Sequence, residues 1–192
     1  LYLNARLGPR PRGCDAAHHM LLSLFDYLIG GIGWAWAGTD DGKPIIRHVD
    51  TLDCYWDLDA KLITDIRWVA ACVREPLYVW IEEFGPEHFD DALDASALEH
   101  PYELVFYFDV DGPGTAAVFK FDGEALDPEP IEIRKNPHVY DYDGKALPFL
   151  PIEPMYHLQL PSVKFPMSLV ETMLAPQIAY RGIEDYLRQI IH

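Results

Sequence analysis

The pattern of apolar positions near the start of the chain predicts an amphipathic helix. Asp15 is a suitable N-cap, and the helix is expected to run to Ile29 because apolar residues recur at helical spacing. The apolar side of this helix consists of Met20, Leu21, Leu24, Phe25 and Leu28. The pair Gly30-Gly31 is expected to end the helix, because glycine adopts positive φ without steric cost.

A β-hairpin is predicted directly after this helix. Trp34 and Trp36 alternate along a strand and therefore share one side of it, and Asp41-Gly42 is a strong hairpin signal before a second strand over 44–49. A β-rich run over 63–73 predicts a further strand. Pro76 then suits the start of a helix that stops at Gly85. The apolar stripe of that helix consists of Leu77, Trp80, Ile81 and Phe84.

The middle of the chain predicts an antiparallel meander. Residues 87–98 are acidic and rich in alanine, which indicates a short surface helix, whereas residues 102–110 alternate with the period of a strand. Turn residues at 111–114 lead into a second strand over 115–121, and a third strand is expected over 130–135. Asp143-Gly144 signals one more reversal. The predicted class is α+β.

Prolines recur through residues 147–166, so neither a helix nor a central strand is expected there except over 155–160. The segment is typical of an extended strap lying along a core. A Pro-rich ligand for an SH3-like partner is the alternative interpretation. The strap completes a predicted α+β domain over 15–166, which follows an extended arm over 1–14. The arm contains Arg6, Arg10 and Arg12 and no acid, so it is either a solvated linker or a contact for phosphate or an acidic neighbour.

The last part of the chain, 167–192, predicts an amphipathic helix. Ser168 and Glu171 form a capping box at its start, and Pro176 is expected to kink it. Its apolar stripe continues to the end of the sequence and is the candidate contact with other subunits. The stripe consists of Ile183, Tyr186, Leu187, Ile190 and Ile191. Because the chain begins at Leu1 and ends inside this pattern, it is expected to be a fragment of a longer protein.

Composition narrows the classes of function. With 15 Lys and Arg against 31 Asp and Glu, the formal net charge is −16, which opposes tight binding of nucleic acid but suits a wall past which DNA slides. The three cysteines, Cys14, Cys54 and Cys72, have no CxxC spacing, so neither a disulfide framework nor a zinc site is indicated and a reducing place of synthesis is expected. No run of about 20 apolar residues predicts a membrane span.

The acidic aromatic loop over 50–60 is the most conspicuous candidate for chemistry. It could be a calcium loop or a carboxylate pair of the glycosidase type, but the EF-hand pattern does not fit because no glycine follows Asp59. Aspartates are also common in turns, where they bond their own backbone. We therefore interpret the loop as structural. Its central residues are Asp53, Tyr55, Trp56 and Asp57.

Two alternative functions remain open at the level of sequence. One is a hydrolase that combines carboxylates of 50–59 with His48 or His157, although no nucleophile elbow, P-loop or HExxH motif is present. The other is a carbohydrate-binding module that uses the five tryptophans, Trp34, Trp36, Trp56, Trp68 and Trp80. His18 and His19 are adjacent, so on a helix they diverge by about 100° and cannot chelate one ion together. No catalytic, cofactor or metal site is predicted.

The order of the segments resembles the portal proteins of tailed bacteriophages. The first half of the resemblance is the helix followed by GGIGWAWAG, VDTLDCYWDLDA, DIRWVA and VREPLYVWIEEFG; the second half is KALPFLPIEP, KFPMSLVETMLAPQ and IEDYLRQIIH. It covers most of residues 16–192. Met167 departs from the pattern, in which a small residue usually precedes the serine.

The resemblance implies a structural subunit with a wing-like α+β domain and the start of a stem helix, without the rest of the stem, the clip or the crown. Such proteins form rings of about a dozen copies through head-to-tail contacts. The implied partners are copies of the same chain, capsid or scaffold protein, the packaging terminase, and double-stranded DNA that passes without sequence specificity. No membrane, cofactor or enzymatic activity is implied. The implied location is the capsid vertex of the virion, after assembly in the host cytoplasm.

Overall fold

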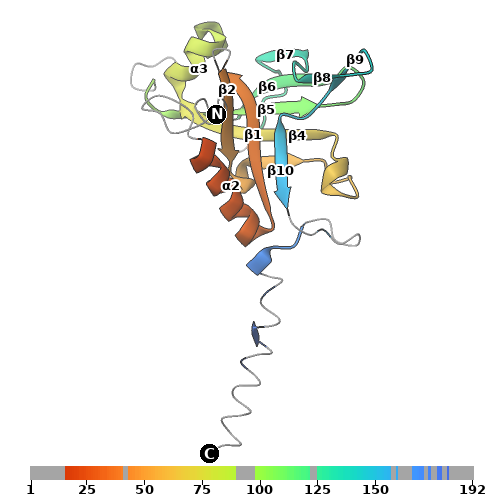
Figure 1. Ribbon diagram of the computed structural model, residues 1–192. Coiled ribbons are helices and arrows are strands. Elements are labelled where there is room, and N and C mark those ends of the chain that lie inside the picture. Colours follow the sequence, from red (N-terminus) through yellow and green to blue (C-terminus); the bar gives the residue numbers. More distant parts are fainter. Residues whose placement is uncertain are drawn as a thin grey trace, which may run out of the picture. The chain divides into compact units, whose positions relative to one another are not determined.

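The protein has an α+β fold with an N-terminal helix and antiparallel strands, as the sequence predicts (Figure 1). The computed structural model describes residues 16–40, 43–89, 98–121, 125–156, 159, 166–170, 173, 177–178 and 181. These residues form two compact units. Unit 1 takes its described residues from 1–51, 58–65 and 152–192, and unit 2 takes them from 52–57 and 66–151. Most of unit 2 is therefore a single long insertion in the chain of unit 1.

Unit 1 is a helix packed on a small sheet. The helix α2 (Ala16–Gly30) precedes β1 (Ile32–Asp40) and β2 (Lys43–Val49), and β10 (Ile152–Tyr156) returns to the other side of β1. The antiparallel sheet has the order β10-β1-β2. Asp40 pairs with Lys43, so the hairpin predicted at Asp41-Gly42 has the expected two-residue connection.

The contact between α2 and β1 is close because small groups meet there. Ser23 is fully buried, and its hydroxyl lies 2.6 Å from the carbonyl oxygen of Trp34 and 3.1 Å from that of His19. Across from it, a Cβ atom at Gly33 would overlap the carbonyl oxygen of Ser23. The helix backbone therefore approaches the strand backbone at a position where only glycine fits.

The sequence-based expectation for the Pro-rich strap was wrong in one respect. The strand β10 begins at Ile152, before the expected start at 155, and it includes Pro154 opposite Trp34 of β1. Of the rest of the expected range, residues 157, 158 and 160 lie outside the described residues. Proline is tolerated because β10 is the edge of its sheet, where one side of the strand needs no N–H donor. Ile152 and Pro151 are fully buried, so this part of the strap does pack into a core.

Unit 2 is the predicted antiparallel meander. Its main sheet has the order β3-β4-β5-β6-β7, and a separate hairpin joins β8 to β9. Asp143 and Gly144 form the two-residue turn of that hairpin, as predicted, and both have positive φ, as a type I′ turn requires. The strands are β3 (Cys54–Trp56), β4 (Trp68–Pro76), β5 (Pro101–Asp109), β6 (Thr115–Phe121), β7 (Glu132–Lys135), β8 (Val139–Tyr142) and β9 (Lys145–Pro148).

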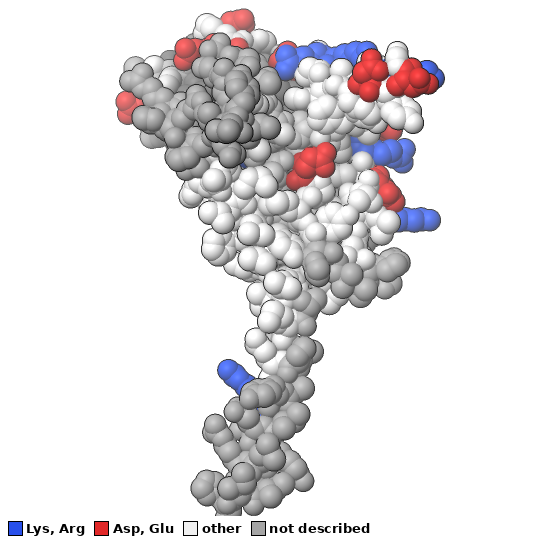
Figure 2. All heavy atoms as spheres, in the orientation of Figure 1, with Lys and Arg blue, Asp and Glu red and all other residues white. Residues whose placement is uncertain are grey.

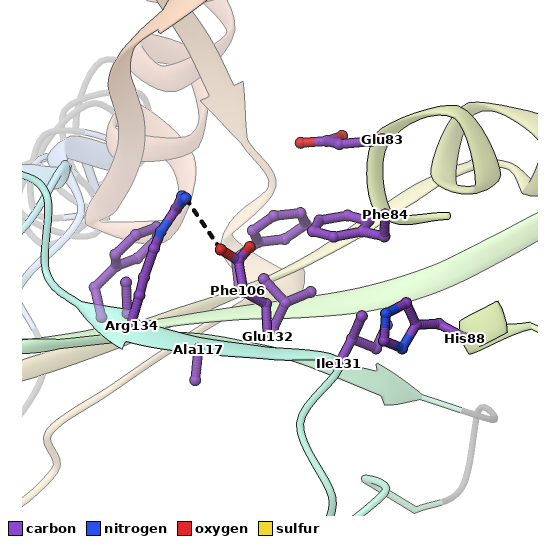
Figure 3. Close-up of a pocket in the computed structure, with 11 residues that line it drawn as sticks. Glu83, Phe84, His88, Phe106, Ala117, Ile131, Glu132 and Arg134 are labelled. Carbon is purple, nitrogen blue, oxygen red and sulfur yellow. Dashed lines mark ion pairs between the residues drawn. The ribbon is translucent and has the colours of Figure 1, made fainter. Parts of the chain in front are cut away.

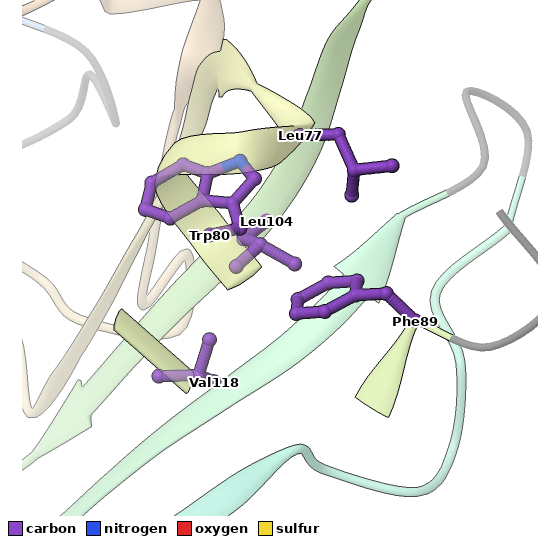
Figure 4. Packing of buried hydrophobic residues seen from close by; sticks show 5 residues of the cluster. All are labelled: Leu77, Trp80, Phe89, Leu104 and Val118. Atoms are coloured by element: carbon purple, nitrogen blue, oxygen red, sulfur yellow. The ribbon is translucent and has the colours of Figure 1, made fainter. Parts of the chain in front are cut away.

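The helix α3 (Leu77–Phe84) contributes to the core of unit 2 (Figure 4). Trp80 is buried there, and its indole Nε1 donates to the carbonyl oxygen of Tyr102 at 2.9 Å. The helix ends at Gly85, whose φ of 92° is a backbone conformation that residues with a Cβ atom rarely adopt. The buried cluster consists of Leu77, Trp80, Phe89, Leu104 and Val118.

Several predictions fall partly outside the described residues. Of the predicted helix over 87–98, the structure shows a 3-10 turn at Pro86–His88, and residues 90–97 are not described. Buried Ser168 precedes helical residues Leu169 and Val170, where the C-terminal helix was expected to begin, but none of the residues of the predicted subunit-contact stripe is described. The predicted boundaries after residues 14 and 166 stay predictions. Within the described ranges, no helix has the combination of length and apolar character that a bilayer crossing requires.

The close packing of α2 on β1 makes Gly33 the sensitive glycine of that strand. Gly33→Ala is expected to destabilise the protein by about 1–3 kcal/mol, because the helix must move away from the added methyl group. Gly38→Ala is the matched control, since a Cβ atom there would lie 3.7 Å from its nearest neighbour, Trp36 Nε1. Gly38→Ala is expected to be neutral or to stabilise by about 0.4–1 kcal/mol. Urea denaturation checks both values, and equal midpoints for the two variants would contradict the proposed contact.

Candidate functional site

The outward face of α2 is an exposed apolar surface of unit 1. Four of the five residues of the predicted apolar side are exposed and do not face the sheet, whereas the fifth, Leu28, is half-buried. The buried positions of α2 are the small residues Ala16 and Ser23. The exposed fractions of the large apolar residues range from 39% to 69%, and these residues are Met20, Leu21, Leu24, Phe25 and Ile29. Such a contiguous apolar surface is typical of an interaction site.

Charge is almost absent from this surface. Asp26 is the only charged residue of α2, and its Oδ2 lies 2.8 Å from Nε2 of His48 and 3.3 Å from the hydroxyl of Thr51. Thr51 also lies within 3.1 Å of the carbonyl oxygen of Ile32. The carboxylate of Asp26 is therefore engaged within unit 1. Figure 2 shows a largely uncharged surface over α2, whereas charged side chains gather over the region of β7, β8 and β9.

The acidic aromatic loop lies beside β3 and provides backbone contacts. Asp53 ends a 3-10 turn, Thr51–Asp53, and Tyr55 and Trp56 belong to β3. Asp57 is buried, its Oδ2 accepts a long hydrogen bond of 3.4 Å from the backbone N–H of Arg67, and its own N–H donates to Trp68. These are the interactions of a structural turn. No cluster of three potential metal ligands occurs within the described part of the chain.

The positions of the histidines and tryptophans concern the two alternative functions, a hydrolase and a carbohydrate-binding module. His48 pairs with Asp26 of α2, a residue outside the acidic loop, and His157 lies outside the described residues. Among the tryptophans, Trp34 and Trp80 are buried, and each belongs to a different unit. Trp68 stacks on Tyr107 with ring centroids 6.0 Å apart. A binding platform that includes all five tryptophans is therefore not formed.

The two described thiols are held in the protonated form. Burial, followed by the negative charge of Asp53, raises the pKa of Cys54. Burial and the nearby carboxylate of Glu103 raise the pKa of Cys72 to about 11. Glu103 also forms an ion pair with Arg74, directly across from it on the neighbouring strand. An elevated pKa is the opposite of what a nucleophilic cysteine needs.

Unit 2 contains a cavity of 380 Å³ beside the main sheet. Phe84 and Phe106 provide aromatic walls, with centroids 6.4 Å apart. Polar groups reach the cavity from three separate elements: Glu83 from α3, His88 from the turn after it, and Glu132 and Arg134 from β7 (Figure 3). The last two form an ion pair of 3.1 Å. The cavity combines a carboxylate-rich rim with an aromatic interior.

Sequence reasoning missed both of these features. Apolar periodicity identifies the stripe of α2 but carries no information on whether a sheet or another molecule covers it. The signal that favours exposure is the buried serine on the opposite side, facing Gly33. The cavity had no sequence signal, because Glu83 and Glu132 are far apart along the chain and come together only through the fold of the sheet.

The state of Cys72 gives a testable consequence. Glu103→Gln is expected to lower the pKa of Cys72, because it removes the nearest negative charge, and to accelerate alkylation by iodoacetamide at pH 8 by about tenfold for each pKa unit recovered. Peptide mass spectrometry measures this thiol separately from Cys14 and Cys54. Glu99→Gln, at an exposed position, is the control of equal charge change. An unchanged rate of Cys72 alkylation in folded Glu103→Gln would show that Glu103 does not raise the pKa of this thiol.

Two comparisons with known proteins found no match. No protein-family model matches the chain, and no curated protein is significantly similar to it. The resemblance to portal proteins therefore depends on the order of the segments and on the residues within them. The structure shows the predicted fold class, an N-terminal helix with an antiparallel meander.

Proposed function

We propose that this chain is part of a structural subunit of a tailed-bacteriophage portal, the ring through which DNA enters and leaves the capsid. The observation that carries the proposal is the exposed apolar face of α2 in an acidic chain, because it is a surface suited to contact with another protein. The identity of the assembly comes from the order of the segments, which resembles the wing and the start of the stem of portal proteins.

The topology supports this proposal. The chain leaves unit 1 after β2, forms most of unit 2, and returns to unit 1 as β10 beside β1. Helical residues begin at Leu169, after buried Ser168. A sheet-rich body followed by a strap and a helix is the order that the resemblance implies. The inserted body has its own hydrophobic core.

The charge of the chain supports a channel component over a DNA-binding protein. A net charge of −16 repels phosphate, so contact with a passing duplex is weak and independent of its sequence. Weak attraction is what sliding requires. The proposed partners are copies of the same chain, capsid or scaffold protein and the packaging terminase, and the proposed location is the capsid vertex after assembly in the host cytoplasm.

Ring formation by identical subunits requires heterologous contacts that close on themselves. In such a contact each copy presents one surface to the next copy and receives a different surface from the previous one. The face of α2 supplies one such surface, since it is apolar and its one charged side chain is engaged within unit 1. The predicted stripe over Ile183 to Ile191 would supply a further contact.

The test is the size of the natural protein that contains this sequence. We expect a large ring with a central hole in negative-stain electron microscopy and a correspondingly large mass by light scattering. Ile29→Ser is expected to shift the protein to smaller species, because it removes an apolar side chain that is 69% exposed on α2. Ile133→Ser is the matched control, at a β7 position that is 66% exposed, and it is expected to assemble like the wild type.

Two results would overturn the proposal. If the natural protein stays a compact monomer at high concentration, it does not form a ring and the proposed function is wrong. Phe25→Ser is a second variant of the same face, where Phe25 is 58% exposed. If the wild type, Ile29→Ser and Phe25→Ser assemble equally, α2 is not the contact between subunits. Circular dichroism of each variant distinguishes lost assembly from lost folding.

A further inference from the structure

We propose that the cavity of unit 2 binds an arginine side chain, and that the arginine belongs to the N-terminal arm of a second copy of this chain. The proposal rests on the proposed assembly and adds a specific site to it. The cavity provides carboxylates and aromatic rings, and the arm provides cationic side chains without acids. Arginine is the residue whose chemistry matches both parts of the cavity.

The aromatic interior fits the flat guanidinium group and the apolar stem that carries it. Phe84 and Phe106 lie at the cavity with ring planes inclined by 49°, and Ala117 and Val118 line the adjoining surface. A guanidinium group stacks on aromatic rings and is less strongly hydrated than an ammonium group, so burial there disfavours it less. The volume of 380 Å³ is at the lower end of the range of ligand pockets, which suits a single long side chain.

The carboxylates provide the charge that the guanidinium requires. In Figure 3, Phe84 and Phe106 lie between Glu83 and Glu132, so a side chain resting on the rings lies within the field of both acids. A carboxylate offers about four lone-pair sites and accepts from more than one donor. Among the Asp, Glu, Lys and Arg side chains of the lining, the two carboxylates of Glu83 and Glu132 outnumber the one guanidinium, that of Arg134.

Arg134 does not fill this role itself. It pairs with Glu132 across two positions of the same strand, and its side chain is 59% exposed. An ion pair at such exposure contributes at most about 1 kcal/mol. Glu132 can therefore accept a second guanidinium at the cavity side without a large loss.

The source of the arginine is argued from charge. The chain has 15 Lys and Arg against 31 Asp and Glu, so basic segments are scarce on any copy. Residues 1–14 contain Arg6, Arg10 and Arg12 and no acid, which makes the arm the clearest cationic segment of the sequence. A negative cavity on one copy and a positive arm on the next are complementary surfaces of different kinds, which a head-to-tail contact requires.

The experiment uses the full chain with its own Arg6, Arg10 and Arg12 changed to Gln, so that the tethered arm does not compete. A fluorescent peptide of residues 1–14, with Cys14→Ser, is titrated into this protein and followed by anisotropy. Saturable binding is expected, and Glu83→Gln or Glu132→Gln is expected to weaken it by about tenfold, the usual loss for one charge-assisted hydrogen bond. The peptide with its three arginines replaced by Gln is expected not to bind.

Two controls localise the effect. Glu129→Gln removes the same charge at an exposed position that does not line the cavity, and it is expected to leave the affinity unchanged. A peptide with lysine in place of all three arginines keeps the charge but loses the planar group, and it is expected to bind more weakly than the arginine peptide. Circular dichroism confirms that each protein variant is folded.

The outcomes separate this site from the proposed function. If the natural protein forms rings but the peptide does not bind, or binds equally to Glu83→Gln, Glu132→Gln and Glu129→Gln, the arginine site is overturned and the ring remains. If the peptide binds in the expected order while the natural protein stays monomeric, the site stands as an arginine pocket and the portal assignment falls. Equal binding of the lysine and arginine peptides would overturn the assignment of a guanidinium.

Discussion

The architecture of unit 1 depends on the close approach of α2 to β1. At this point the helix presents Ser23 and the strand presents Gly33, and neither has a side chain that would hold the two backbones apart. The hydroxyl of Ser23 bonds to the carbonyl oxygen of Trp34, so the contact is polar and geometrically exact. The fully buried positions of α2 are therefore small, Leu22 and Leu28 are half-buried, and the other large apolar residues of the helix lie on the outward face.

This arrangement gives the two units different sources of stability. Unit 2 buries large side chains, including Trp80 and Phe89, in a core of its own. In unit 1, several large apolar residues of α2 remain exposed, and the helix is held by its close contact with β1 and by the pairing of Asp26 with His48. Covering the exposed stripe with another molecule would remove apolar surface from water, and a partner that binds only the folded chain stabilises it. In the proposed ring, assembly and stability would thus be coupled through α2.

The sequence predicts those parts of the fold that depend on local chemistry. Asp143-Gly144 and the two-residue connection between Asp40 and Lys43 are turns whose residues determine their geometry, and Gly85 ends α3 where expected. The strand at β10 was misplaced because proline excludes a central strand but not an edge strand, and edges are a property of the whole sheet. The direction of the α2 stripe and the cavity between Glu83 and Glu132 depend on tertiary packing. No local pattern encodes them.

The charge of the chain constrains how copies of it can meet. A body of net charge −16 repels an identical body, and this repulsion is strongest where two acidic surfaces face each other within about a Debye length. In the proposed ring, copies would therefore meet at surfaces that are apolar or complementary in charge. The face of α2 carries one charged residue, Asp26, whose carboxylate is hydrogen-bonded to His48, and the cavity of unit 2 has two carboxylates in a chain that also carries a basic arm. Apolar contact supplies affinity, whereas a match between two different surfaces sets the head-to-tail orientation of neighbouring copies. A closed ring needs both.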